Sequence, residues 1–229
     1  KRHDTNILGV CCTDIHNKWQ YFDDEETVFE FCNREKIRHI SHSDILNMDP
    51  DIGFSIRYHK IIEKEVIDKF KLGIINIHGG ILPKYKGTYS NIHSILNGEQ
   101  EYGVTLHYID ENIDNGDIID ILSEPIDEDD TGFDLFLKSL KLGYEILIRN
   151  LDDLLYGKNK RVKQSSILNN TTNNNIYYKK DIDMLQYIPY EKLGDRYSFQ
   201  VIKAFSSPYH EPAFTVTNNK KIYLKYKYI

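Results

Sequence analysis

Residues 51–56 read Asp-Ile-Gly-Phe-Ser-Ile, residues 61–70 read Ile-Ile-Glu-Lys-Glu-Val-Ile-Asp-Lys-Phe, and residues 73–77 read Gly-Ile-Ile-Asn-Ile. The first and third stretches are short, rich in isoleucine and accompanied by glycine, which predicts buried strands, whereas the middle stretch has helical spacing of its apolar residues. A strand, a helix and a second strand in this order are typical of a mostly parallel sheet with helices on both faces. The sequence therefore predicts an α/β, Rossmann-like fold, in which ligands bind at the carboxyl ends of the strands.

The same alternation continues on both sides of this stretch. Further elements are expected as a strand over 7–12, a helix over 25–36, a loop over 79–87, a helix over 90–97, a strand over 104–109 and a long helix over 131–156. After residue 157 the pattern changes. An Asn-rich loop is expected over 169–175, and a hairpin is expected around Asn218-Asn219. We therefore expect a main domain over 1–157 and a small β-rich appendage over 158–229.

Composition and charge narrow the class of protein. The chain has 229 residues, 40% of them hydrophobic and 28% charged, which is typical of a globular domain. The net charge of −6 divides into −12 over residues 1–150 (16 basic, 28 acidic) and +6 over residues 151–229 (13 basic, 7 acidic). This disfavours a general nucleic-acid binder but allows one phosphate-bearing ligand. We expect no membrane span, because no apolar run approaches eighteen residues, and the three cysteines suit a reducing cytoplasm.

Polar residues that could carry chemistry follow the strand at 73–77. Asn76 and His78 are two residues apart, so their side chains leave the backbone on the same side. An amide and an imidazole could together donate to an oxyanion and handle a proton, as acyl transfer requires. Asp114 lies in an Asp-Asn-Gly turn, where Gly116 permits unusual dihedral angles, and could orient the imidazole. Taken singly, a histidine at a strand end is more often a structural residue, and an Asp-Asn-Gly sequence is usually an ordinary turn.

The combination resembles the formyltransferases that use 10-formyltetrahydrofolate. That family has an Asn-x-His motif, a Leu-Pro-x-x-[Arg/Lys]-Gly loop, a Gly-Val-Thr strand and an Asp-x-Gly turn, in this order. The matching segments of this chain are Asn76-Ile77-His78, Leu82-Pro83-Lys84-Tyr85-Lys86-Gly87, Gly103-Val104-Thr105 and Asp114-Asn115-Gly116. The resemblance is strong over 51–122 and poor after 157.

The resemblance implies the roles of the site residues. Asn76, His78 and Asp114 would form the catalytic triad, 10-formyltetrahydrofolate would be the formyl donor, and no metal would be needed. Backbone groups of two loops would hold the pterin, and the matching positions are Lys60, Ile61, Ile62, Ile109, Asp110, Glu111 and Asn112. For Ile61, Ile62 and Ile113, packing in the core is an equally good interpretation. A structural or solvent-exposed role is the better interpretation for His93.

Three formyl acceptors compete within the family. A glycinamide ribonucleotide enzyme would end soon after the long helix, and a methionyl-tRNA formyltransferase would need a larger C-terminal domain. The chain looks most like the bacterial formyltransferases that act on dTDP-linked amino-dideoxyhexoses, with the amine at C3 or C4, for surface polysaccharide synthesis. The residues expected to contact this acceptor are Lys84, Tyr85, Lys86 and His107, although solvated loop lysines are an equally good interpretation for the two lysines.

Two further expectations follow from the resemblance. The appendage is expected to cover the substrate or to pair two chains in a homodimer. The family begins with a strand, a turn and a helix, so we expect roughly 20 to 25 residues to precede this chain. Two alternatives remain open, a methionyl-tRNA formyltransferase and a non-catalytic folate-binding module.

Overall fold

The computed structural model describes residues 5–12, 26–58, 60–167, 175–208 and 210–226. The chain divides into two compact units, residues 1–74 and residues 75–229. The boundary that the sequence predicts after residue 157 falls inside the second unit and stays a prediction.

The first unit contains the helices α1 (Val28–Arg34), α2 (His42–Ile45) and α3 (Lys64–Ile67) and the strand β1 (Gly53–Ile56). Capping boxes start α1 and α2, because Thr27 and Ser41 each exchange hydrogen bonds with an acidic residue three positions later. The strand expected over 7–12 is wrong. In the described part of this segment, pairing is limited to a parallel bridge between Val10 and His39, and Ile7 is 65% exposed.

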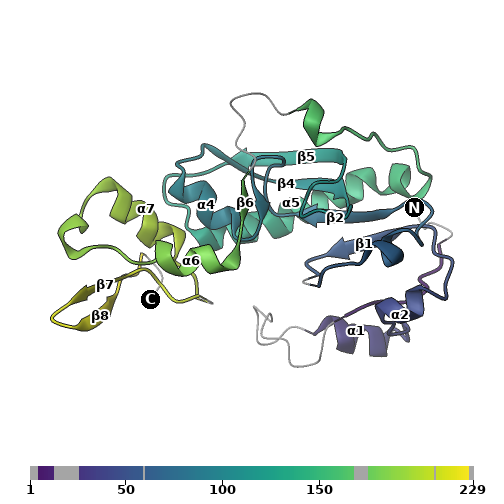
Figure 1. Ribbon diagram of the computed structural model, residues 1–229, viewed down its shortest axis with the longest axis horizontal. Helices are drawn as coiled ribbons and strands as arrows, with labels where there is room; N and C mark the ends of the chain where they lie inside the picture. The colour runs from purple at the N-terminus through teal and green to yellow at the C-terminus, as the bar shows by residue number, and fades with distance from the viewer. Residues whose placement is uncertain (1–4, 13–25, 59, 168–174, 209, 227–229) are drawn as a thin grey trace. The chain divides into compact units, whose positions relative to one another are not determined.

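The sheet of the second unit is built from β2 (Ile74–His78), β4 (Glu101–Tyr108) and β5 (Ile118–Pro125), as Figure 1 shows. The α/β fold is confirmed. Within this unit β2 pairs with β4, and β4 with β5, in antiparallel register. The segment 109–117 that joins β4 to β5 is too short for a parallel connection, which needs a dozen residues or more. Side chains from Tyr102 to Tyr108 are all buried, so β4 lies in the centre of the core.

Helices cover this sheet as the apolar periodicity predicts. The long helix α5 (Gly132–Leu155) packs against β4 and β5 and begins at a capping box between Thr131 and Asp134. The short helix α4 (Ser90–Leu96) packs against α5. The loop predicted between β2 and α4 is present and includes the two-residue strand β3 (Lys86–Gly87).

The C-terminal segment contains more helix than the β-rich appendage that the sequence predicts. It has α6 (Lys179–Leu185) and α7 (Arg196–Ala204), two single turns, η1 (Gln164–Ser166) and η2 (Tyr190–Lys192), and the strands β6 (Ile176–Tyr177), β7 (Phe214–Thr217) and β8 (Lys220–Tyr223). The expected hairpin is confirmed: Asn218 and Asn219 both have positive φ, as a tight type I′ turn requires. Apart from Asn175, the Asn-rich loop lies outside the described residues.

The C-terminal segment shares one core with the preceding helices. The helix α7 packs against α4 and α5. Buried side chains from both parts form a single cluster that includes Ile92, Leu135, Ile188, Val201 and Phe205. This shared burial explains why α7 is a helix: its apolar residues have a hydrophobic surface to pack on. None of the described helices is long and apolar enough to cross a membrane.

Candidate active site

The three residues of the expected triad lie together in the second unit. Asn76 and His78 project from the same side of β2, and Asp114 lies in the turn between β4 and β5. Nδ1 of His78 is 3.4 Å from Oδ2 of Asp114, and the His78 side chain is only 8% exposed. The β4–β5 turn therefore brings a carboxylate to the end of β2, as the sequence predicts.

Asn76 is held by a partner on the neighbouring strand. Asn76 and His107 face each other in the antiparallel register of β2 and β4, and Nδ2 of Asn76 lies 3.0 Å from Nε2 of His107. Nδ1 of His107 lies 2.8 Å from the carbonyl oxygen of Tyr108, which can only accept, so the proton resides on Nδ1. Nε2 therefore accepts a hydrogen bond from the Asn76 amide.

The protonation state of His107 supports this assignment. Burial and, to a smaller extent, the nearby His78 lower the pKa of His107 to about 4, against the opposing effect of the Asp114 carboxylate. The ring is 1% exposed and uncharged at neutral pH. An amide has two N–H bonds, so Asn76 can donate one to His107 and the other to a substrate oxygen. His107 contacts Asn76, and its expected contact with the acceptor stays a prediction.

A backbone group of the loop that contains β3 holds the carboxylate of Asp114. The backbone N–H of Gly87 donates to Oδ2 of Asp114 at 2.8 Å. Asp114 itself has a φ of 45°, an unusual left-handed conformation for a residue with a side chain. The expectation that Gly116 adopts unusual dihedral angles is wrong, because its φ is not positive. A Cβ at Gly116 would lie 1.9 Å from the carbonyl oxygen of Tyr108, so close packing requires the glycine.

The loop between β2 and β3 is tied to His78 and to β4. Nε2 of His78 lies 2.5 Å from the carbonyl oxygen of Tyr85, to which it donates. The fully buried hydroxyl group of Thr105 donates to the carbonyl oxygen of Gly80 at 2.7 Å and accepts from the N–H of Leu82 at 3.0 Å. These bonds hold the Leu-Pro-x-x-Lys-Gly loop beside the imidazole.

The two lysines expected to bind the acceptor have different surroundings. Lys86 is only 4% exposed, and its Nζ donates to Oδ1 of Asn115 at 2.8 Å. Burial lowers the pKa of Lys86, and the carboxylates of Asp110 and Asp114 oppose this. Lys84 instead forms an ion pair of 2.7 Å with Glu99, at the wall of a half-open cavity of about 430 Å³. Lys86 therefore lies next to the triad turn and Lys84 lies beside Glu99, and the expected contacts of both lysines with the acceptor stay predictions.

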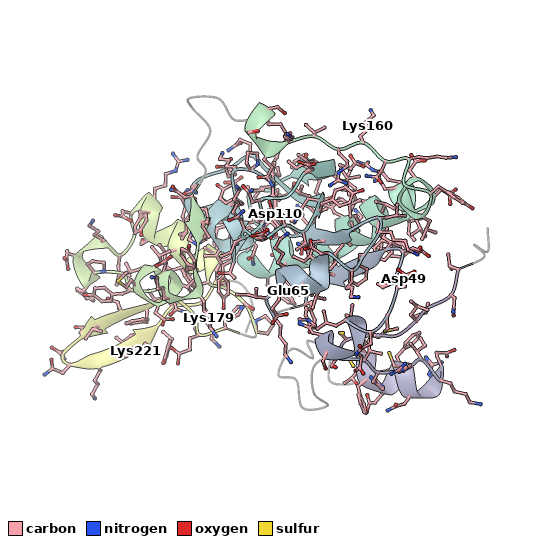
Figure 2. All side chains as sticks on the ribbon, turned by 45° about the vertical axis from the view of Figure 1, so that its right-hand side comes forward. Asp49, Glu65, Asp110, Lys160, Lys179 and Lys221 are labelled. Carbon is pink, nitrogen blue, oxygen red and sulfur yellow. The ribbon has the colours of Figure 1, made fainter. Side chains whose placement is uncertain are left out.

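The segment after β4 contains one of the two loops expected to hold the pterin. Asp110, labelled in Figure 2, accepts from the backbone N–H of Asn112 at 2.8 Å and from the side chain of Asn115 at 3.0 Å. Glu111, Asn112 and Ile113 are exposed. This loop therefore presents backbone and apolar surface directly beside Asp114. Exposed Ile113 is not core.

The other expected loop, Lys60–Ile62, belongs to the first unit. Ile61 is 84% exposed, which excludes its interpretation as a core residue. Ile62 is half-buried, and Lys60 is exposed. The role of this loop stays a prediction.

Four further residues contact the site but were not among the expected site residues. Gly87 and Thr105 lie inside motifs that resemble the family, so those motifs could have indicated them. Gln164 and Tyr177 lie 50 and 63 residues after Asp114, where the resemblance is poor. Their spacing in the sequence carries no hint of a contact with the site.

Comparison with known proteins gives the family of the chain. A protein-family model described as "Formyl transferase" matches residues 16–151, which is more than half of the chain. The chain belongs to the formyl transferase family. A curated relative, the methionyl-tRNA formyltransferase of Lysinibacillus sphaericus, is 38% identical over 120 residues, which cover 52% of this chain and 38% of the relative. This formyl transferase chain spans less than half the length of the curated relatives it matches.

Solved structures of formyl transferases match over more of the chain. The N-formyltransferase of Helicobacter canadensis, in complex with folinic acid and dTDP-3-aminofucose, is 28% identical with a TM-score of 0.75 and covers 90% of this chain and 73% of that protein. WlaRD, a sugar 3N-formyl transferase in the presence of dTDP and 5-N-formyl-THF, is 32% identical with a TM-score of 0.70. That match covers 86% of this chain and 68% of WlaRD.

Proposed function

We propose that this formyl transferase moves a formyl group from 10-formyltetrahydrofolate to the amino group of a nucleotide-linked amino sugar, a dTDP-linked amino-dideoxyhexose being the first candidate. The observation that carries the proposal is the cluster of Asn76, His78 and Asp114 in a chain similar to the Helicobacter canadensis enzyme over 90% of its length. A match of that extent must include most of the residues after 157.

The chemistry of the site residues fits a folate formyl donor. Bound 10-formyltetrahydrofolate would supply an activated formyl group on nitrogen. The loop 109–112 beside Asp114 offers backbone groups for the pterin, and Lys60–Ile62 is proposed to offer more. In the transfer the acceptor amine would bond to the formyl carbon while negative charge builds on the formyl oxygen. The bond from that carbon to N10 of the folate would then break, and the proton that the amine loses would pass to N10 as tetrahydrofolate leaves.

Each triad residue then has one task. The amide of Asn76, oriented by His107, donates an N–H to the formyl oxygen. His78 lies between the carbonyl oxygen of Tyr85 and the carboxylate of Asp114, so a positively charged imidazole has an acceptor at each nitrogen. This arrangement lets His78 hold a proton near the oxyanion and lets Asp114 stabilise the charged ring.

The acceptor and the assembly are part of the same proposal. Lys86 and Tyr85 would lie near a bound diphosphate through the loop they share with Gly87. The +6 charge of residues 151–229 suits an anionic ligand. We also infer a homodimer, supported by the exposed apolar side chains Val216, Ile222 and Tyr223 of the hairpin. A cytoplasmic location stays a prediction.

A second candidate is formylation of methionyl-tRNA. It is favoured by the 38% identity to the methionyl-tRNA formyltransferase of Lysinibacillus sphaericus. That match covers only 52% of this chain, and the net charge of −6 disfavours a large RNA contact.

A direct assay separates the candidates. Purified full chain is given 10-formyltetrahydrofolate and either a panel of nucleotide-linked 3- and 4-amino sugars or methionyl-tRNA, and the formylated product is identified by mass. The Asp114→Asn variant is the control for uncatalysed transfer. Product from a sugar alone supports the proposal. Product from tRNA alone, with binding that falls steeply with salt, would establish the second candidate. Folate binding without product from either would indicate a binding module.

A further inference from the structure

Two residues of the C-terminal segment contact the two partners of the hydrogen bond between Gly87 and Asp114. Gln164 contacts Asp114, and Tyr177 contacts Gly87. Gln164, in η1, is 4% exposed, and its Nε2 donates to the carbonyl oxygen of Asp114 at 2.8 Å and to that of Gly116 at 2.9 Å. One side-chain amide therefore holds both ends of the triad turn. A left-handed conformation is strained for a residue with a side chain, so Asp114 needs surroundings that fix it.

Tyr177, in β6, holds the other partner of that bond. Tyr177 pairs with Gly87 in the parallel β3–β6 ladder, and its carbonyl oxygen accepts from the N–H of Thr88 at 2.9 Å. Gly87 has a φ of 91°, and a Cβ there would lie 2.1 Å from the carbonyl oxygen of Tyr177. The two backbones therefore touch at the residue whose N–H reaches Asp114.

The ring of Tyr177 fixes the same loop through side chains. It stacks on the ring of Tyr85 with centroids 5.7 Å apart, and it lies against the buried ring of His93 at 3.9 Å. The carbonyl oxygen of Tyr85 accepts from His78. Tyr177 thus contacts both residues of the loop, Tyr85 and Gly87, whose backbone groups bond the triad.

We propose that Gln164 and Tyr177 are positioning residues for the catalytic aspartate. Gln164 fixes the turn that carries Asp114, and Tyr177 fixes the loop that donates to its carboxylate. The proposal rests on the proposed function in that Asp114 acts in formyl transfer. It gives the C-terminal segment a part in the chemistry in addition to substrate coverage and pairing. A shift of about 1 Å in a catalytic group can cost roughly a hundredfold in rate, so loosening either contact lowers turnover.

Gln164→Met removes the hydrogen bonds to the triad turn, and Tyr177→Ala removes the ring contacts with Tyr85 and His93 while the backbone pairing with Gly87 remains. Each variant has a matched control. Gln186 is a buried glutamine whose Nε2 donates to the carbonyl oxygen of Glu211 at 2.7 Å, so Gln186→Met removes an equivalent bond away from the triad. Tyr190→Ala removes a tyrosine that is 61% exposed. Tyr177→Phe keeps the ring and should restore the activity that Tyr177→Ala loses. Thermal unfolding identifies variants that fail to fold. Tyr177→Phe and Gln164→Met change the side-chain volume least and are therefore expected to disturb the fold least.

The kinetic readout separates positioning from general destabilisation. We expect kcat to fall on the order of ten- to a hundredfold in Gln164→Met and Tyr177→Ala, with the KM for formyl donor and acceptor little changed. Both controls should retain the wild-type kcat. An unchanged kcat in both test variants, or an equal fall in the controls, would overturn the proposal.

Hydrogen exchange gives a readout that does not depend on activity. The amides of Gly87 and Thr88 should exchange faster in Tyr177→Ala and at the wild-type rate in Tyr190→Ala. Unchanged exchange at both amides would overturn the role of Tyr177 whatever the kinetics show. If the wild-type chain formylates no acceptor, the proposed function fails, and the exchange rates alone then decide whether Tyr177 holds the loop.

Discussion

The backbone N–H of Gly87 donates to the carboxylate of Asp114 at 2.8 Å, across a separation of 27 residues. Gly87 is also in contact with Tyr177, with no room for a Cβ between the two backbones. One glycine therefore joins the triad turn to the C-terminal segment.

Substitution of this glycine should be far more damaging than its backbone angle alone explains. Gly87→Ala adds a left-handed alanine, which costs about 1–2 kcal/mol, and a Cβ only 2.1 Å from a carbonyl oxygen. Gly194 has a similar φ of 95°, and a Cβ added there would meet no atom within 4 Å, so Gly194→Ala measures the strain alone. We expect Gly87→Ala to lose more thermal stability than Gly194→Ala and to lose nearly all turnover. Equal stability losses would show that the Gly87–Tyr177 contact is not tight.

Each triad residue should be needed for turnover but not for folding. Asn76→Ala, His78→Asn and Asp114→Asn each remove a group proposed to contact the reacting atoms. We expect kcat to fall on the order of 100- to 1,000-fold, with little change in thermal unfolding. Asn47→Ala, at an exposed position in the first unit, is the control. Near-normal turnover in Asn76→Ala or His78→Asn would refute the assignment. For Asp114→Asn, lost folate binding with an unchanged rate in the bound complex would make Asp114 a binding residue instead.

His107 should affect kcat through Asn76. His107→Phe keeps a ring in the buried position but removes the acceptor of the Asn76 amide. Without that acceptor the half-buried Asn76 amide is free to turn away from the formyl oxygen, so we expect roughly a tenfold or greater fall in kcat with the folate KM unchanged. In His107→Gln the side-chain oxygen can accept in place of Nε2, and part of the activity should return. Equal activity in the two variants would argue against an orienting role.

Stability should fall with acidity because two buried histidines resist protonation. Burial lowers the pKa of both His93 and His107 to about 4 from an ordinary value of 6.5, and the carboxylate of Asp181 opposes the shift at His93. Between pH 6.5 and 4 the unfolded chain binds protons that the folded chain does not, so the free energy of unfolding decreases as the pH falls through this window. Each pKa unit is worth about 1.4 kcal/mol, so the loss amounts to a few kcal/mol per histidine.

Denaturant unfolding at a series of pH values tests this. His93→Phe should flatten the pH dependence, because the ring against Tyr177 is kept while the titrating group is removed. Tyr144→Phe, at a position that is 69% exposed, should leave the dependence as in the wild type. A slope that is the same in all three proteins would exclude His93 as a source of acid sensitivity.

The helices and strands that the sequence predicts correctly are those with a long or regularly repeated apolar pattern. The long helix, the helix at α4, the strand at β4 and the Asn-Asn hairpin were all expected within a few residues of their observed bounds. The strand over 7–12 was wrong because an apolar run becomes a strand only where a partner strand pairs with it, and Val10 pairs at a single point. The helix α7 was missed although its own sequence carries an apolar face and a capping aspartate, Asp195, and that face packs against α4 and α5.

The candidate site was predictable only where its residues lie in short motifs. Asn76 and His78 share a strand, and the resemblance supplied Asp114. Gln164 and Tyr177 belong to a segment that is distant in the sequence and contacts the triad only because of the way the chain folds. The spacing of residues in the sequence does not indicate such contacts. His107 was found as a residue near the site, but its role depends on which strand faces β2 and in which register.

The late position of Tyr177 in the chain has a consequence for synthesis. Proteins are made from the N-terminus, and segments begin to fold as they emerge from the ribosome. Asn76, His78 and Asp114 are all translated before Gln164, and Tyr177 follows after a further thirteen residues. On the roles inferred for these two residues, a nascent chain holds its complete triad before it can hold that triad in working geometry. Activity would then begin only when the chain is long enough for Tyr177 to pair with Gly87.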